Sequence, residues 1–312
     1  MKILVTGGAG FIGSHLIDAL LERGDEVICF DNFSSGRREF IEHNLGQMEL
    51  VEGDLLNRSD IGKAIKGCDA VFHLAANPDV RSGAGNTKTH FDNNIVATYN
   101  LLEEMRENGV TKIAFTSSST VYGEASVIPT PENYGPLIPI SIYGASKLAS
   151  EALIASYCHT FDMDAIIYRF ANVVGPRSTH GVIYDFINKL KANPEQLEIL
   201  GDGTQKKSYL YIDDCVEAML FGFDRMKEKV EIYNIGSEDW TDVKTIADIV
   251  SSEMGLRPEY KFTGGLDGRG WKGDVKFMRL DISKLKEKGW NPRHSSNDAI
   301  RMTARWLIKE IG

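Results

Sequence analysis

The feature that most constrains the fold of this chain is a run of glycines close to its beginning. A short apolar strand pattern, Lys2–Thr6, leads directly into segment 7–13, whose sequence is G-G-A-G-F-I-G. An amphipathic helix pattern follows from Ser14 to about Arg23. A strand that enters a helix through a glycine turn is typical of the first βαβ unit of an α/β fold. The sequence therefore predicts an α/β protein with a ligand-binding turn in its first unit.

Three glycines in this turn are spaced G-x-x-G-x-x-G, and each has a separate task. Gly7 permits the tight turn, Gly10 lets the backbone approach a pyrophosphate, and Gly13 lets the helix and the strand pack closely. The first N–H groups of the helix have no internal partners and carry a partial positive charge, so they suit an anion. Glycines also serve ordinary turns, so this spacing alone makes the segment a candidate dinucleotide site and no more.

An acidic residue at the end of the second strand pattern supports the dinucleotide interpretation. The apolar run Glu26–Phe30 ends in Asp31, and a carboxylate about 20 residues past the glycines fits a hydrogen bond to an adenosine ribose. A carboxylate there would also repel a 2′-phosphate, which favours NAD over NADP. The alternative is that Asp31 caps a helix or lies on the surface.

Composition excludes several classes of partner. The 312 residues are 42% hydrophobic and 25% charged, with a net charge of −9. This acidic balance, without any Lys/Arg run, argues against binding to nucleic acid or to an anionic membrane. No apolar stretch is long enough to span a bilayer, and the chain starts on its first strand with no signal peptide, so we expect a cytoplasmic protein. Cys29, Cys68, Cys158 and Cys215 lie far apart and are expected to be buried, reduced thiols, and no metal site is expected.

The first half of the chain alternates strand and helix patterns. Such alternation predicts a doubly wound parallel sheet of the Rossmann type, with helices on both faces and ligands beyond the carboxyl ends of the strands. Helical patterns are expected at about 58–66, 93–108 and 144–160. Further strands are expected at Met48–Val51, Ala70–Leu74, Lys112–Thr116 and Asp164–Arg169. The strand-end positions with functional weight are Thr6, Asp31, Asp54, Ala75, Ser118 and Asn172.

The alternation loosens after about residue 172. We therefore predict an NAD-binding Rossmann domain over 1–172 and a smaller α+β substrate-binding domain over 173–204 and 237–312. The chain is expected to return to the first domain within 205–236, through strands near 207–212 and 230–236.

A tyrosine and a lysine four residues apart open the helix pattern at 144–160. Residues four apart share a helix face, so Tyr143 and Lys147 are expected to project together. A phenol has a pKa of about 10, and a nearby ammonium together with a cationic nicotinamide would favour the phenolate. The pair is therefore a candidate base and its support, although a Y-x-x-x-K spacing is also typical of a solvated helix face.

Three serines follow the strand pattern Lys112–Thr116. Ser118 is expected at the carboxyl end of that strand, where its hydroxyl could hydrogen-bond a sugar hydroxyl that Tyr143 deprotonates. The alternative is a turn in which serine hydroxyls bond the backbone, and this alternative is favoured for Ser117 and Ser119.

These segments together resemble the extended short-chain dehydrogenase/reductases, specifically the NAD-dependent epimerase/dehydratase family. Within it the chain is most similar to the nucleotide-sugar 4-epimerases that act on UDP-glucose and UDP-galactose. The resemblance covers nearly the whole chain. The segments that carry it are T-G-G-A-G-F-I-G (6–13), Asp31-Asn32, Gly53-Asp54-Leu55, H-L-A-A (73–76), Asn93-Asn94, S-S-S-T-V-Y-G (117–123), Y-G-A-S-K (143–147), R-F-A-N (169–172), Y-L-Y-I-D-D (209–214), Y-N-I-G (233–236) and Gly273-Asp274-Val275.

The resemblance implies roles for individual residues. Tyr143, Lys147 and Ser118 would be catalytic. The residues that would bind NAD are Gly7, Gly10, Phe11, Ile12, Gly13, Asp31, Asn32, Ser35, Gly36, Asp54, Leu55, Leu74, Ala75, Ala76, Asn93, Ser117, Tyr143, Lys147 and Phe170. The residues that would bind the UDP-hexose are Ser118, Tyr143, Asn172, Gly181, Val182, Leu200, Lys207, Tyr209 and Asp274.

Two departures from the family pattern concern the nucleotide. Lys207 stands where the family usually has Arg, which keeps the charge but loses the bidentate fork for a diphosphate. The family's R-x-G-D segment is Trp271-Lys272-Gly273-Asp274 here, so its guanidinium is missing. Arg269, Lys272 and Arg81 are the candidates to replace it. Met278 falls where the family adjusts the pocket for N-acetylated sugars, and methionine does not decide between them.

The resemblance implies 4-epimerisation through transient oxidation at C4 by tightly bound NAD, in a homodimer that pairs helices 93–108 and 144–160 in a four-helix interface. Several alternatives stay open. A UDP-glucuronate or UDP-N-acetylhexosamine 4-epimerase, or a decarboxylase, would keep the same base, and Arg81 could meet a carboxylate. A 4,6-dehydratase would carry T-D-E-V-Y-G at the serines, which this chain lacks. A non-catalytic NAD-binding regulator would be expected to lose Tyr143 or Lys147, and an ordinary dehydrogenase would exchange free NAD. A monomer is the alternative to the dimer.

Overall fold

The computed structural model of the chain describes residues 1–81, 83, 85–265 and 267–311. These residues form two compact units. The first unit comprises Met1–Val121, Ser141–Arg169 and Met219–Tyr233, and the second comprises Tyr122–Ile140, Phe170–Ala218 and the chain from Asn234 onward.

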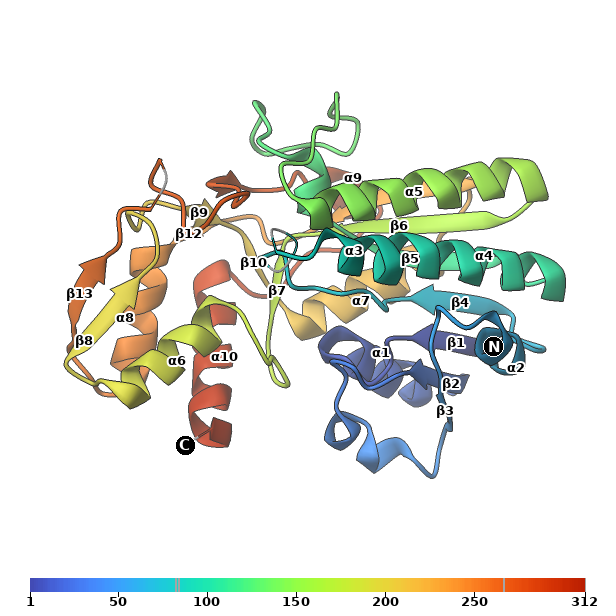
Figure 1. Cartoon of the computed structure of the whole chain (residues 1–312), viewed down its shortest axis with the longest axis horizontal. Helices are drawn as coiled ribbons and strands as arrows, with labels where there is room; N and C mark the ends of the chain where they lie inside the picture. The colour runs from blue at the N-terminus through green and yellow to red at the C-terminus, as the bar shows by residue number, and fades with distance from the viewer. Residues whose placement is uncertain (82, 84, 266, 312) are drawn as a thin grey trace. The chain divides into compact units, whose positions relative to one another are not determined.

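A mostly parallel sheet of seven strands is the centre of the first unit (Figure 1). Its strand order is β11-β6-β5-β4-β1-β2-β3, and β1 pairs in parallel with both β2 and β4. The order of the strands reverses at β1, which is the kind of switch point where doubly wound sheets bind ligands. The predicted fold class is confirmed. The strands are β1 Lys2–Thr6, β2 Glu26–Asp31, β3 Glu49–Glu52, β4 Ala70–His73, β5 Lys112–Ser118, β6 Asp164–Phe170 and β11 Val230–Ile235.

Helices cover both faces of this sheet (Figure 1). Successive strand residues point to opposite faces, and β4 shows both environments. Val71 belongs to the core that α2, α4 and α5 cover, whereas the ring of Phe72 lies 4.8 Å from that of Phe223 in α7. The helices are α1 Phe11–Glu22, α2 Arg58–Ala64, α3 Thr87–His90, α4 Ala97–Asn108, α5 Ile142–Phe161 and α7 Ile212–Phe223.

Two helices begin earlier than the sequence pattern predicts. Helix α1 begins at Phe11 instead of Ser14, because the last residues of the glycine turn already have helical conformation. The predicted helix 93–108 is preceded by α3 and by a π-helical stretch, Phe91–Val96, that leads into α4. Asn86 caps this longer helical segment by accepting a hydrogen bond from the Thr89 N–H.

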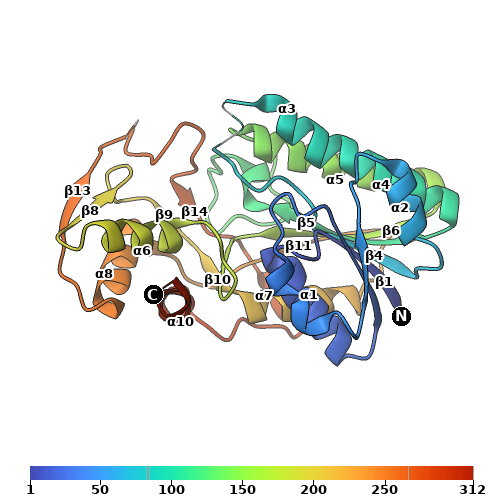
Figure 2. The same ribbon diagram turned by 60° about the horizontal axis from the view of Figure 1, so that its bottom comes forward.

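The second unit is built from small sheets and a helical core, which agrees with the α+β prediction. Helices α6, α8 and α10 lie side by side in Figure 2 and share the core residues Phe186, Ile246 and Ile300. The helices are α6 Val182–Ala192, α8 Val243–Glu253, α9 Ser283–Glu287 and α10 Ser296–Ile311. The paired strands are β7 Asn172–Val174 with β10 Tyr209–Tyr211, β8 Gln196–Ile199 with β13 Glu259–Phe262, and β9 Lys206–Lys207 with both β12 Thr241–Asp242 and β14 Phe277–Met278.

One predicted return of the chain to the central sheet is wrong. Strand β11 joins the seven-stranded sheet, as predicted for 230–236, but 207–212 does not. Tyr209–Tyr211 pairs instead with Asn172–Val174 in a separate two-stranded sheet, because β7 offers it a parallel partner immediately after β6.

The segment 122–140, which the prediction left inside 1–172, groups with the second unit. Thr130 ties it there: its N–H donates to the carbonyl of Arg279, and its own carbonyl accepts from the Asp281 N–H, both at 2.9 Å. These backbone bonds hold a loop that contains no strand or helix pattern of its own. Whether the predicted domain ranges correspond to separate functions stays a prediction.

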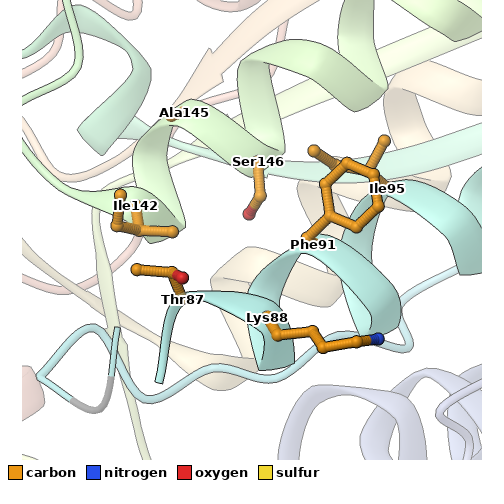
Figure 3. Close-up of a pocket in the computed structure, with 7 residues that line it drawn as sticks. All are labelled: Thr87, Lys88, Phe91, Ile95, Ile142, Ala145 and Ser146. Atoms are coloured by element: carbon orange, nitrogen blue, oxygen red, sulfur yellow. The ribbon is translucent and has the colours of Figure 1, made fainter. Parts of the chain in front are cut away.

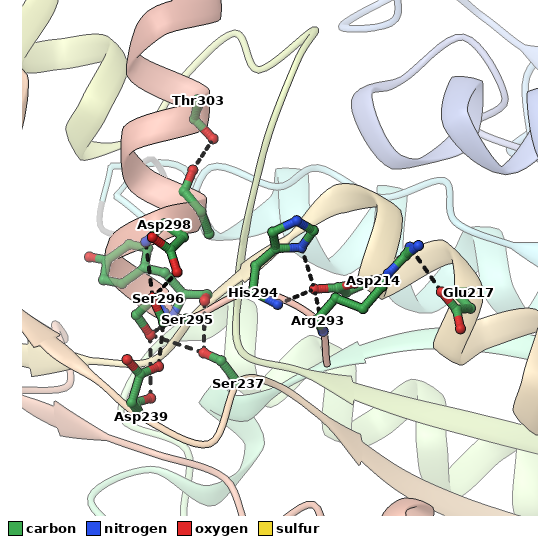
Figure 4. A network of polar contacts seen from close by, with 12 residues as sticks. Asp214, Glu217, Ser237, Asp239, Arg293, His294, Ser295, Ser296, Asp298 and Thr303 are labelled. Atoms are coloured by element: carbon green, nitrogen blue, oxygen red, sulfur yellow. Dashed lines mark hydrogen bonds and ion pairs between the residues drawn. The ribbon is translucent and has the colours of Figure 1, made fainter. Parts of the chain in front are cut away.

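A buried carboxylate holds the segment that leads into α10 (Figure 4). Asp214 is fully buried and accepts hydrogen bonds from the backbone N–H groups of Arg293 and His294 and from both of their side chains, at 2.9–3.1 Å. The Ser296 hydroxyl donates in turn to the Asp239 carbonyl. The second aspartate of the Y-L-Y-I-D-D segment therefore has a structural task in the second unit.

Two expectations about the whole chain can be compared with the described residues. All four cysteines are buried and free, as predicted. Within residues 1–81, 83, 85–265 and 267–311, we find no helix whose length and apolar character would let it cross a bilayer.

Candidate active site

The glycine turn leaves the first turn of α1 free of protein anions. Gly10 is the residue before the helix, no side chain caps the N–H groups of the first turn, and no acidic residue lies in that turn. Gly7 has a positive φ of 69°, and a Cβ on Gly13 would lie 2.1 Å from the Gly7 carbonyl oxygen. Only glycine fits these two positions, and the resulting row of open N–H groups suits a pyrophosphate.

Asp31 hydrogen-bonds the backbone of this turn. It is 7% exposed, and its carboxylate accepts hydrogen bonds from the N–H groups of Ala9 and Phe33, both at 2.9 Å. A Cβ on Gly36 would lie 2.8 Å from the same carboxylate. Burial raises the pKa of Asp31 above its usual value. The alternative interpretations are wrong, because the carboxylate is neither on the surface nor bonded to a helical N–H.

The other residues expected on the cofactor side fall into two groups. Asn32 donates to the Asp54 carboxylate at 3.2 Å, and the run Leu74–Ala76 follows directly after β4. The amide group of Asn93 and the hydroxyl of Ser117 instead bond protein partners, the Thr89 carbonyl and Glu151. Phe11, Ile12, Ser35, Gly36 and Leu55 lie in the first unit, and Phe170 lies in the second.

Tyr143 and Lys147 lie together on the first turns of α5. The Ser141 hydroxyl starts this helix by accepting from the Gly144 N–H at 3.0 Å. Lys147 is 3% exposed, and its ammonium donates to the Thr116 carbonyl at 2.8 Å. Its Nζ lies 5.9 Å from the centre of the Tyr143 ring, as the spacing of four residues predicts. A fully buried lysine held in this way is not part of a solvated helix face.

Burial governs the pKa values of both groups in the protein alone. Tyr143 is partly buried, and desolvation raises the pKa of its phenol to about 12, against a smaller lowering by the Ser118 side chain. Desolvation also lowers the pKa of Lys147 to about 7, which the charge of Glu151 partly opposes. The expected lowering of the Tyr143 pKa requires Lys147 together with a cationic nicotinamide, so it stays a prediction beside the raised pKa of the protein alone.

A buried ion pair, which the sequence reasoning missed, lies one helical turn after Lys147. The Glu151 carboxylate accepts from the Arg169 guanidinium at 2.7 and 3.0 Å, and the Ser117 hydroxyl donates to it at 2.5 Å. All three side chains are at most 5% exposed. This network connects β5, α5 and β6 next to Ser118. The spacing of Tyr143, Lys147 and Glu151, each four apart on α5, was the signal that could have identified it.

His90 is a second residue that the pattern did not reveal. Its ring is fully buried and meets the edge of the Tyr143 ring, with 5.8 Å between the ring centres. Its Nε2 lies 3.1 Å from the Asp79 carbonyl oxygen, so this nitrogen carries the proton. His90 immediately precedes the π-helical stretch, a distortion that is often found at functional sites.

The second unit holds the residues expected to bind the nucleotide. Lys207 donates to the Asp274 carboxylate at 2.6 Å, and its Nζ lies 5.4 Å from the centre of the Trp271 ring. Arg269 donates to the Asp274 carbonyl at 2.7 Å and forms an ion pair with Glu124. Of the three candidates for the missing guanidinium, Arg269 joins this cluster, whereas Lys272 is exposed and Arg81 lies in the first unit.

The remaining predicted substrate residues are spread over several elements of the second unit. Gly181 precedes α6 and has a φ of 100°, and Val182 is the first residue of that helix. Asn172 and Tyr209 are partners in the β7–β10 ladder, and the Tyr209 ring is buried. Leu200 accepts through its carbonyl from the Gln205 side chain at 3.0 Å.

Known proteins are similar to this chain in both sequence and fold. The model of the NAD dependent epimerase/dehydratase family matches residues 3–236. A UDP-glucose 4-epimerase of Mycolicibacterium smegmatis is 32% identical, with 98% of each chain covered. A crystal structure of a UDP-galactose 4-epimerase is 48% identical, covers all of both chains and has a TM-score of 0.91.

A third relative has a different substrate. The UDP-glucuronic acid 4-epimerase of Bacillus cereus, solved with UDP-glucuronic acid and NAD, is 32% identical over all of both chains, with a TM-score of 0.90. The glycine turn and the buried Asp31 fit the NAD that this relative binds. The family match covers most of the chain, and the relatives cover nearly all of it. The chain belongs to the NAD-dependent epimerase/dehydratase family and is an enzyme of its nucleotide-sugar epimerase group, with NAD as its cofactor.

Proposed function

We propose that this enzyme interconverts UDP-glucose and UDP-galactose by transient oxidation at C4 of the hexose. The observation that carries the proposal is the arrangement around Tyr143: the ammonium of the buried Lys147 lies 5.9 Å from the centre of its ring, and Ser118 lowers the pKa of its phenol. The Tyr143 phenol, assisted by the Ser118 hydroxyl, can exchange a proton with a sugar hydroxyl. Bound NAD would accept the C4 hydride and return it to the opposite face.

The side chains of the first unit perform the proton chemistry. Tyr143, as the phenolate, takes the proton of the sugar 4-OH and gives it back after the hydride returns. Because burial keeps this phenol protonated in the protein alone, ionisation depends on the positive charges brought together at the site. Lys147 supplies one of them, and its bond to the Thr116 carbonyl fixes where that charge stands.

The open N–H groups of α1 would hold the cofactor pyrophosphate, and the Asp31 carboxylate would bind the adenosine ribose. Gly10 and Gly13 let the backbone come close enough for both contacts. Tyr143 and Lys147 would hold the nicotinamide ribose.

We assign the nucleotide diphosphate to the cations of the second unit. Lys207 and Arg269 each bond Asp274, through its carboxylate and its carbonyl respectively. A lysine contributes a point charge and an arginine a planar fork, so together they can replace the single guanidinium usual in the family. Asn172, Tyr209, Leu200 and the start of α6 are proposed to contact the sugar and the uracil.

The proposal is tested by incubating the purified protein with UDP-galactose, without added NAD, and measuring UDP-glucose. Conversion under these conditions requires cofactor that stayed bound through purification, which an ordinary dehydrogenase would not retain. UDP-glucuronate and UDP-N-acetylglucosamine are assayed in parallel, because the relative from Bacillus cereus acts on the former. Faster conversion of either sugar than of UDP-galactose would replace the proposed substrate, and no conversion of any of them would end the proposal.

We also propose that two copies pair through the helices that carry Phe91, Tyr99, Ile142 and Phe161. These large apolar side chains are 42–55% exposed. Phe91 and Ile142 line a hollow at the start of α5 (Figure 3). A monomer would leave these apolar side chains in water, and pairing with a second copy would bury them. Light scattering should give twice the mass of the chain, and Phe91→Glu should give the monomer mass; a monomer in the unmodified protein would exclude this interface.

A further inference from the structure

The ring of His90, next to the candidate base, is held by three neighbours. His90 is fully buried, and its Nε2–H donates to the Asp79 carbonyl at 3.1 Å. Its other ring nitrogen, Nδ1, lies 3.5 Å from the side-chain nitrogen of Asn94. A Cβ on Gly83 would lie 2.8 Å from the His90 ring, so even a methyl group at that position would collide with it. The imidazole therefore has little room to turn or to move.

The orientation of the Asn94 amide decides the protonation of this ring. The Asn94 side-chain oxygen accepts from the Asn77 N–H at 2.8 Å, so the Asn94 nitrogen is the donor that faces His90. With a donor at Nδ1 and the Asp79 carbonyl at Nε2, the imidazole is neutral and carries its proton on Nε2. A neutral ring adds no charge to the site, so what it contributes there is its shape.

This fixed ring packs directly against Tyr143. The planes of the two rings are at 68° and their centres are 5.8 Å apart, which is an edge-to-face contact. The backbone of Tyr143 is held from the same helical segment. Asn94 donates to the Ser146 hydroxyl at 2.8 Å, and that hydroxyl donates to the Tyr143 carbonyl at 2.7 Å. His90 and Asn94, four residues apart, thus hold the ring of Tyr143 directly and its backbone through Ser146.

We propose that His90 is a positioning residue, which keeps the Tyr143 phenol aimed at the reacting sugar hydroxyl by restricting the Tyr143 ring. The proposal rests on the proposed function, in which Tyr143 is the base. A phenol can turn about two side-chain bonds, and a misplacement of about 1 Å at a reacting group can cost about a hundredfold in rate. Because His90 acts through Tyr143, its loss should change the rate of reaction and not the binding of the UDP-sugar.

Two substitutions of His90 separate the ring contact from the hydrogen bond. His90→Phe keeps a flat ring against Tyr143 and loses the N–H donor. His90→Gln keeps an N–H that can reach the Asp79 carbonyl and loses the ring. His43→Gln is the matched control, since it makes the same change at an exposed histidine of the first unit, whose ring bonds Asp18.

The first test compares initial rates of the NAD-loaded variants and the unmodified enzyme with UDP-galactose. His90→Gln should lower kcat about tenfold with KM within about twofold, because the placement of the base matters only as the proton moves. His90→Phe should keep about a third or more of the normal kcat, and His43→Gln should match the unmodified enzyme. A normal kcat in His90→Gln, or equal losses of kcat in His90→Gln and His90→Phe, would overturn the proposal.

A second measurement does not depend on turnover, so it separates this proposal from the proposed function. NAD-loaded protein is prepared with ¹³C-labelled tyrosine rings, and the NMR signal of Tyr143 is identified by its absence in Tyr143→Phe. The relaxation of this signal should show faster ring motion in His90→Gln than in the unmodified protein or in His90→Phe. Equal relaxation in His90→Gln and the unmodified protein would reject the role of His90. Failure of the proposed substrate would appear only in the rate assay.

Discussion

The two candidate binding regions of this molecule are built on different physical principles. Around Tyr143, in the first unit, buried groups are bonded to partners fixed by strand and helix, such as Lys147 on the Thr116 carbonyl. Around Asp274, in the second unit, two long cationic side chains meet one aspartate and a tryptophan. The first arrangement fixes the orientation of the reacting groups, and the second supplies positive charge for an anionic ligand. The comparison suggests that changes near Tyr143 affect the rate of reaction, whereas changes near Asp274 affect the strength of binding.

The largest expected effect comes from replacing Tyr143, the candidate base of the first region. Tyr143→Phe removes the proton acceptor and should lower kcat about a thousandfold, while the protein still binds NAD. Initial rates with UDP-galactose and the NAD released on denaturation measure the two properties. Tyr157→Phe is the matched control. It removes a phenol hydroxyl from the same helix, but that hydroxyl bonds Glu103. A Tyr143→Phe variant with more than a tenth of the normal rate would remove Tyr143 from its assigned role.

The second prediction concerns the buried ion pair between Glu151 and Arg169. Glu151→Gln breaks the buried ion pair with the Arg169 guanidinium, and breaking such a pair costs about 3–5 kcal/mol. The midpoint of urea unfolding should fall accordingly. Replacing both residues by Met should recover most of the loss, since neither charge of the pair then remains.

The control for Glu151 is an ion pair on the surface. Lys244→Gln breaks the exposed pair with Asp248 on α8, which should cost less than about 0.5 kcal/mol. Equal shifts for Glu151→Gln and Lys244→Gln would mean that the buried network contributes nothing particular to the first region.

The third prediction addresses the second region. Lys207→Ala should raise KM for the UDP-sugar about tenfold and leave kcat within twofold, because a charge on the diphosphate acts equally in the ground state and the transition state. Lys207→Arg should keep the normal KM or lower it. Arg269→Ala should also raise KM, whereas the exposed Lys272→Ala should not. A loss of kcat at unchanged KM in Lys207→Ala would erase the distinction between the two regions.

The difference between the regions also explains how far the sequence could predict each. The glycine turn, Asp31 and the Tyr143–Lys147 pair follow from local rules, because φ angles, strand ends and helix faces depend on neighbours in the chain. The seven-stranded sheet follows from the same rules applied to alternating patterns. The exception was 207–212, whose pairing with β7 depends on where the chain goes after β6.

Contacts between distant segments could not be predicted in this way. Glu151 meets Ser117 and Arg169 only after β5, α5 and β6 have assembled, and Arg269 pairs with Glu124, which lies far from it in the sequence. The raised Tyr143 pKa of the protein alone could not be predicted for a related reason. Spacing indicates which charges are near a group, but only the packed structure shows how much water the group has lost.

The smallest expected effect tests how much stability is lost by burying the Lys147 charge in the first region. The pKa of Lys147 is lowered from its usual value near 10.5 to about 7 by burial, so between these pH values the unfolded chain binds a proton that the folded protein does not. Stability therefore increases with pH across this window, by up to about 1.4 kcal/mol per pH unit from this group alone. Below pH 7 both states bind the proton, so the contribution of Lys147 no longer changes with pH. The proton is lost from Tyr143, by contrast, only above this window.

Lys147→Met isolates this contribution, since methionine fills a similar volume and does not titrate. The variant should be more stable than the unmodified protein at pH 7, and its advantage should shrink by about 1 kcal/mol between pH 7 and pH 8 as Lys147 loses its proton in the folded state. Urea unfolding of both proteins at the two pH values measures the difference, and Lys244→Met on the exposed face of α8 controls for the loss of a surface lysine. The same advantage at both pH values would mean that Lys147 does not titrate in this window. Its charge would then be kept in the folded protein by the Thr116 carbonyl and Glu151, and the first region would hold a permanent cation as the second does.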